Sequence, residues 1–242
     1  MHVHLPKPLH GWRAFVGEVG IIVIGVLIAL GAEQVVESVR DRQAASAARD
    51  NIRTEINSNL TSLAMRSQNE PCVSRRLDEI AAALANPPSM GSPTIWIGHP
   101  YYSSLHDVQL RVSEQGGHAT LLPRAEQARY ATIYSDFALY MGAQSDEIRA
   151  WADLRVLEQR PALTPVADWQ LRSALQQART ARWLMEAAGR QAMTAAAKLG
   201  ITAGKVAPWP QQSACIPYHT PRQTALAEVA AGRPGGDIYD EP

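Results

Sequence analysis

The feature that most constrains this chain is an uncharged apolar run near its N-terminus, VGIIVIGVLIALGA over residues 19–32. This run alone is short for a membrane-spanning helix, which needs about 20 residues. It extends to residues 14–36 if Glu18 lies near the lipid headgroups, and Trp12 precedes it as an interfacial anchor does. We therefore predict a short cytoplasmic head over residues 1–13 and a membrane-spanning helix over 14–36.

A cleaved signal peptide is the alternative interpretation of this run. Ala29-Leu30-Gly31 resembles a small-residue cleavage site, and the apolar core has the length of a signal peptide. Glu18 is unusual at the head of such a core, however, and the length and flanking residues favour a retained anchor.

Small residues share one face of the predicted span. Gly25, Ala29 and Ala32 recur at i, i+4 and i+7, a spacing that lets a second helix approach closely. Ordinary use of glycine and alanine in a lipid-facing helix is the alternative. Glu18, at the membrane edge, is a candidate contact for a partner's basic residue, although its shallow depth favours headgroup water.

The charges that flank the span leave its orientation open. Lys7 and Arg13 precede it, and a simple count of the basic residues that follow favours a cytoplasmic domain: Arg40, Arg42, Arg49 and Arg53. Long domains cross membranes largely regardless of charge, and paired cysteines belong in an oxidising compartment. We therefore predict a bacterial inner-membrane protein with a cytoplasmic N-terminus and a periplasmic main domain.

The rest of the chain carries helical periodicity. One long helix is expected to leave the membrane and end near Ser67, with a stripe of Ile52, Ile56, Leu60 and Leu63. Short helices are expected over residues 72–85 and 102–114, around a proline-rich loop. Two further long helices are expected, one after Pro123 and one from Thr164, its polar cap, to about Leu199.

The two later helices have apolar stripes typical of a bundle seam. The first stripe has one gap, at Gln144, and comprises Tyr130, Tyr134, Phe137, Met141, Ile148 and Trp151. The second comprises Leu171, Leu175, Ala178, Met185 and Met193. The predicted fold class is all-α: a transmembrane helix that continues into a long helix, then an antiparallel helical bundle. The helical extracytoplasmic domain covers residues 37–220, and a C-terminal helix and flexible tail cover 221–242.

The sequence carries no recognisable catalytic motif, whether phosphate-binding loop, dinucleotide fingerprint, zinc-protease motif or nucleophile elbow. His106, Glu114 and His118 surround one short helix, but Gly116 and Gly117 interrupt it. The adjacent carboxylates of Asp78-Glu79 and Asp146-Glu147 face different directions on a helix and are interpreted as solvated surface. We therefore predict no catalytic residue, no metal site, no cofactor and no enzymatic activity.

Charge and cysteine content narrow the function further. The chain has 23 basic and 23 acidic residues, which argues against a nucleic-acid partner, because that class needs a basic face. Cys72 and Cys215 lack metal-ligand spacing. From spacing alone, a long-range disulfide and two unrelated buried thiols are equally supported.

The segment GEVGIIVIGVLIALGAEQ (residues 17–34) resembles the N-terminal anchor of a widespread family of uncharacterised bacterial single-span proteins. In that family a Gly-Glu pair precedes an I-x-I-G-V-L-I-A-L run. The similarity continues at residues 75–80, 113–123, 129–134 and 215–221. The resemblance implies a helical extracytoplasmic domain with no assigned activity, and pairing of Cys72 with Cys215. The chain departs around His106, where similar proteins tend to carry tryptophan.

These observations predict a non-enzymatic, single-pass accessory or structural subunit of a larger membrane protein complex. Its expected partners are membrane lipid and either an integral-membrane protein or further copies of itself. The alternative is a periplasmic sensing or ligand-binding helical module. That module would act through a partner, because only about a dozen residues precede the predicted span.

Overall fold

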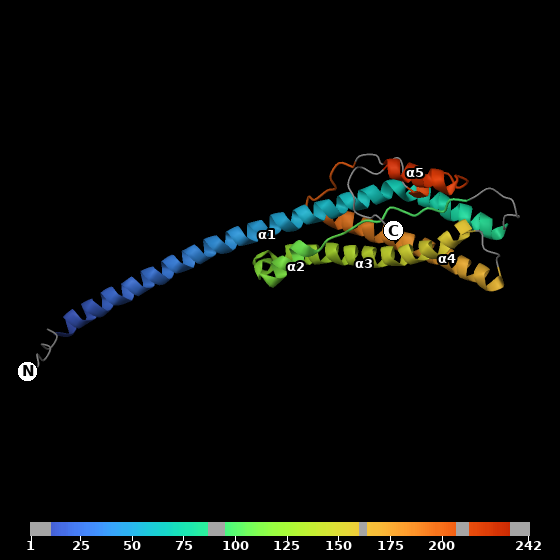
Figure 1. Ribbon diagram of the computed structural model, residues 1–242. Coiled ribbons are helices and arrows are strands. Elements are labelled where there is room, and N and C mark those ends of the chain that lie inside the picture. Colours follow the sequence, from blue (N-terminus) through green and yellow to red (C-terminus); the bar gives the residue numbers. More distant parts are fainter. Residues whose placement is uncertain (1–10, 87–94, 160–163, 207–212, 233–242) are drawn as a thin grey trace, which may run out of the picture.

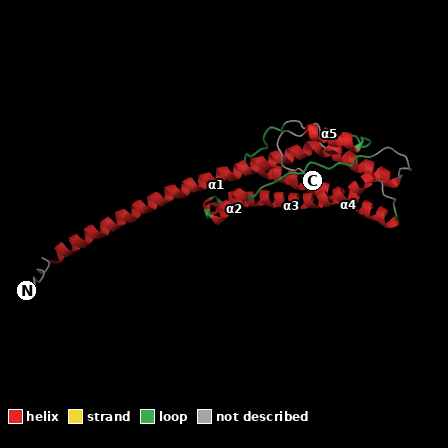
Figure 2. Ribbon diagram, viewed as in Figure 1, coloured by secondary structure: helices red, strands yellow, loops and turns green. Residues whose placement is uncertain are grey.

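The computed structural model describes residues 11–86, 95–159, 164–206 and 213–232, and every regular element in these ranges is helical. Figure 1 shows one helix far longer than the others. Its C-terminal half packs with the other helices in a bundle, and its N-terminal half projects alone. Figure 2 shows the helices joined by loops. The all-α fold predicted from the sequence is confirmed.

The long helix, α1 (Gly11–Ala85), continues for 75 residues, about 110 Å at 1.5 Å per residue. The predicted end near Ser67 and the separate helix from Cys72 are wrong, because Pro71 lies inside α1. Proline has no N–H to donate to the Ser67 carbonyl. Because Ser67 and Pro71 are both exposed, the missing hydrogen bond falls on the exposed side of α1. The helix continues because its next turns bury four apolar side chains: Val73, Leu77, Ile80 and Leu84.

Two long helices form the rest of the bundle. α3 (Arg124–Leu154) and α4 (Pro165–Ala197) pack along each other and against α1. α3 runs in the same direction as α1 and is followed by the 3-10 helix η2 (Arg155–Gln159), and α4 returns antiparallel. Thr164 caps α4 as predicted, since its side chain accepts a hydrogen bond from the Ala167 amide.

The predicted core faces are largely confirmed. The stripe on α1 is buried throughout: Ile52, Ile56, Leu60 and Leu63. On α4 the predicted residues are buried except Met193, which is partly buried. On α3, Ile148 is 41% exposed whereas Gln144 and Glu147 are buried, so the placing of Ile148 in the seam is wrong. Gln144 and Glu147 are buried although they are polar, and a search for apolar periodicity does not identify buried positions of this kind.

Residues 95–107 form an extended segment, so the predicted helix over 102–114 is wrong in its first half; α2 spans only Val108–Gln115. Two buried amides hold this segment. Gln144 accepts from the Ser103 amide at 2.7 Å and donates to its carbonyl at 2.8 Å. Asn59 makes the same pair of bonds to His106, at 2.9 and 2.7 Å. Each amide therefore replaces the neighbouring strand that an extended backbone needs.

The C-terminal segment lies against the outer end of α1 (Figure 1). It contains the short 3-10 helix η3 (Ser213–Cys215) and α5 (Arg222–Gly232). The C-terminal helix predicted from residue 221 is confirmed, and the predicted flexible tail after it lies outside the described residues. Between α2 and α3, η1 (His118–Leu121) completes the end of the bundle nearest the projecting half of α1.

Trp151 tests this packing because its side chain is fully buried between the helices. We expect Trp151→Ala to lower the free energy of unfolding by about 3–5 kcal/mol, the scale for truncating a buried aromatic. Trp169→Ala is the matched control, because Trp169 is 69% exposed, and should change stability by less than about 0.5 kcal/mol. Denaturant melts of the detergent-solubilised chain measure both, and equal effects would contradict the assigned core.

Candidate functional site

A buried arginine holds the two irregular segments of the bundle on α1. Arg76 has no exposed surface, and burial lowers the pKa of its guanidinium. It donates to four acceptors: the carbonyls of Trp96, Ile97 and Ile216, and the Glu79 carboxylate. One side chain therefore fixes the segment before α2 and the segment before α5 at the same place.

A disulfide lies beside this arginine. Cys72 and Cys215 are joined, with Cα atoms 4.8 Å apart, so the pairing that the family resemblance implies is present. The bond closes a loop with a sequence separation of 143, which stabilises the fold by about 4–5 kcal/mol in the chain-entropy model. The Trp96 indole also donates to the Ser213 carbonyl at 2.9 Å. The C-terminal segment is thus tethered both covalently and by hydrogen bonds.

Four charged side chains alternate in sign across the three long helices. Glu147 on α3 accepts from Arg66 on α1 at 2.9 Å, and Arg66 pairs with Glu70 at 2.7 Å. Glu70 in turn meets Arg182 on α4 at 3.3 Å. Arg66 and Glu147 are 2% and 0% exposed. Because an unpaired buried charge is costly, this ion chain constrains the relative register of the helices.

The interpretation of the adjacent carboxylates as solvated surface is therefore wrong for Glu147. Asp146 and Asp78 are exposed, as expected, and Glu79 is partly covered beside Arg76. Burial raises the pKa of the Glu147 carboxyl to about 7, and the attraction of Arg66 opposes that shift. Within the described structure the Glu147 Oε2 atom has no hydrogen-bond partner. This carboxyl changes its charge near neutral pH.

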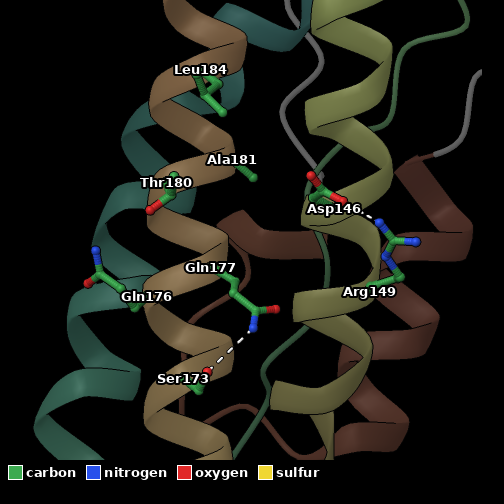
Figure 3. A pocket seen from close by; sticks show the side chains of 8 residues that line it. All are labelled: Asp146, Arg149, Ser173, Gln176, Gln177, Thr180, Ala181 and Leu184. Atoms are coloured by element: carbon green, nitrogen blue, oxygen red, sulfur yellow. Dashed lines mark hydrogen bonds and ion pairs between the residues drawn. The ribbon is translucent and has the colours of Figure 1, made fainter.

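An open groove lies between α3 and α4, on the side away from α1. Its volume is about 440 Å³, and Figure 3 shows its lining: Asp146, Arg149, Ser173, Gln176, Gln177, Thr180, Ala181 and Leu184. Glu147 pairs with Arg66 on α1, whereas its neighbour Asp146, about 100° further around α3, lines the groove. The Asp146–Arg149 ion pair forms one wall, and the other wall, on α4, is polar or small except for Leu184.

Two exposed tryptophans flank the α4 wall of this groove. Trp169 precedes Ser173 by one turn and Trp183 follows Thr180 by one turn, so both lie on the exposed face of α4 next to the groove, although neither lines it. They are 69% and 61% exposed. Tryptophan is enriched among the residues that dominate binding at protein interfaces. The groove and the two indoles are therefore the clearest candidate interaction surface of the bundle.

The predicted contact residues of the span lie outside the bundle. Glu18, Gly25, Ala29 and Ala32 are all exposed. In this region α1 is long and apolar enough to cross a membrane, with a mean hydropathy of 2.4 over 18 residues, none of them buried. Positions 25 and 52 are about seven and a half turns apart at 3.6 residues per turn. Since Ile52 faces the core, the small face points away from the bundle.

The structure does not bring together the histidines considered as a metal site. His106 pairs through its backbone with Asn59, and His118 begins η1 beyond the glycine turn. Among the described residues no group of three or more His, Cys, Asp or Glu side chains is placed to hold a metal ion.

Four buried polar residues that organise the bundle were not predicted from the sequence: Asn59, Arg66, Arg76 and Glu147. Each is polar yet occupies a helix position that the apolar repeat assigns to the core: Asn59 lies beside Leu60 and Ile56, and Arg76 beside Val73 and Leu77. A polar residue inside an apolar stripe was the available signal.

Comparison with protein-family models, curated proteins and solved structures found no match. The resemblance of the anchor to a family therefore stays a prediction.

The buried carboxyl of Glu147 makes stability depend on pH. Its pKa is about 7 in the folded state and 4.5 when unperturbed, so between these values the folded state binds the proton and the unfolded state does not. Stability should therefore rise as pH falls from about 8 to 5. Glu147→Gln keeps an acceptor for Arg66 and should flatten this dependence. Denaturant midpoints at several pH values test this, and an unchanged slope in the variant would assign the effect elsewhere.

Proposed function

We propose that this protein is a non-enzymatic, single-pass accessory subunit that docks on a larger membrane protein complex. The observation that carries the proposal is the groove between α3 and α4 with Trp169 and Trp183 beside it, because two large indoles are left in solvent at 69% and 61% exposure. Tryptophan is over-represented among the residues that dominate binding at protein interfaces, so we take this face of α4 as the docking surface.

The span supports the same proposal. Its small face points away from the bundle, so a partner's membrane helix is able to pack on Gly25, Ala29 and Ala32 without meeting α3 or α4. Close approach there needs no rearrangement, since a Cβ atom added to Gly25 meets nothing within 4 Å in this chain.

We place the bundle in the periplasm and the N-terminus in the cytoplasm of a bacterial inner membrane. The support is the disulfide between Cys72 and Cys215, because such bonds persist in oxidising compartments and are rare in the cytosol.

A sensing or ligand-binding module is the second candidate. Its site would be the groove between α3 and α4, where the polar side chains of Asp146, Ser173 and Gln177 lie along the walls. A monomer stabilised by a small molecule, with no associated protein, would support it over the subunit.

The orientation is tested with a reporter that is active only in the periplasm, fused after Pro242. We expect activity, and we expect thiol alkylation in intact cells to find Cys72 and Cys215 unmodified. A fusion active only with a cytoplasmic reporter would reverse the proposed orientation.

Partner docking is tested by affinity purification from mild detergent with mass spectrometry. We expect the double variant Trp169→Ala, Trp183→Ala to recover at least tenfold less of the partner, a loss of about 1.4 kcal/mol or more. Gly25→Leu should weaken the same association by blocking helix approach in the membrane. Leu226→Ala is the control, since Leu226 is similarly exposed, at 47%, but lies on α5. Identical partner recovery for all variants would contradict the proposal.

A further inference from the structure

The end of the bundle nearest the projecting half of α1 leaves apolar side chains in solvent. Val108 and Val112 on α2 are 47% and 56% exposed, and Leu121 on η1 is 40% exposed. The two valines are one helical turn apart and therefore share a face of α2. On its other side α2 packs inward through Leu110 and Ser113. The exposed face is thus separate from the core.

The continuous helix fixes how far this face lies from the proposed membrane. Ala45 is the first α1 residue that packs against the core, and the span ends at Val36. The helix rises by nine residue steps from Val36 to Ala45, about 14 Å at 1.5 Å per residue. A headgroup layer is about 5–7 Å thick. The remaining distance is under about 10 Å, within reach of side chains and of an ordinary helix tilt of about 20–40° toward the bundle.

The surrounding polar groups suit a lipid interface. Arg111, between the two valines, has 60% of its side chain exposed and pairs only at the surface, with Asp107. Arg124 and Arg129, at the start of α3, are also exposed. Valine and leucine side chains flanked by arginines match the boundary between acyl chains and phosphates, where apolar groups are buried and guanidinium groups meet headgroups.

We infer that α2 and η1 rest on the surface of the same phospholipid bilayer that holds the anchor, with Val108, Val112 and Leu121 at the headgroup boundary. This inference rests on the proposed membrane anchor. It adds a second membrane contact, about 70 residues after the span in sequence, that restricts how far the bundle swings about the exposed stretch of α1 between Val36 and Ala45.

The test uses the full chain in vesicles of phosphatidylcholine and phosphatidylglycerol. Val112→p-benzoylphenylalanine introduces a photo-reactive side chain at the proposed contact. Val166→p-benzoylphenylalanine is the matched control, because Val166 is 66% exposed but begins α4 at the far end of the bundle. Val23→p-benzoylphenylalanine reports the span itself. All three positions are exposed in the chain, so the bundle should fold normally, which a denaturant melt checks.

On illumination we expect phospholipid adducts at positions 112 and 23 and at least tenfold fewer at 166. Adducts at 23 with none at 112 would overturn this inference and leave the anchor standing. An adduct of position 112 with protein instead of lipid would overturn it in favour of a docking site for another chain. Absence of lipid adducts at position 23 would remove the proposed anchor, and the inference with it.

Discussion

The bundle depends on polar side chains that α1 buries and cannot satisfy by itself. Asn59, Arg66 and Arg76 are each at most 2% exposed, and a buried donor without a partner destabilises a fold. Asn59 holds the extended segment through His106, and Arg66 joins α3 through Glu147. Arg76 fixes the backbone of the segments before α2 and before α5. Three positions along one helix therefore specify where the remaining segments lie.

Continuity of α1 links these contacts to the N-terminal half. Helix breaks at proline arise from the lost hydrogen bond and from steric conflict with the preceding turn, and here both fall on the exposed side, at Pro71. The buried side of the same turns carries Val73 and Leu77, and the disulfide at Cys72 secures the next residue. Packing outweighs the local signal, so the predicted span and the bundle share one helix.

Apolar periodicity predicted the helical class, the core stripes of α1 and α4, and most of the stripe of α3. It failed where a polar group had been buried with a distant partner. Gln144 looked like a gap in the α3 stripe, yet its amide binds Ser103. Glu147 looked like surface, yet Arg66 comes from 81 residues away in sequence. Residues 102–107 were wrongly predicted to be helical for the same reason, because Gln144 and Asn59, on other helices, bind the backbone of Ser103 and His106. The candidate groove has no sequence signature, since it forms only when α3 and α4 pack.

The two surfaces assigned to protein partners lie on opposite sides of the molecule. The small face of the span is on the side of α1 away from the bundle, whereas the groove is on the side of α3 and α4 away from α1. A helix packed against Gly25 therefore cannot continue straight into the groove beside Trp169 and Trp183, because the bundle stands between them. In the proposed complex, the two surfaces would therefore contact different parts of the assembly, one in the membrane and one beside the bundle. In that arrangement the continuous α1 joins the two contacts. The buried ion chain of Glu147, Arg66, Glu70 and Arg182 maintains the alignment of α3 and α4 on which the groove depends.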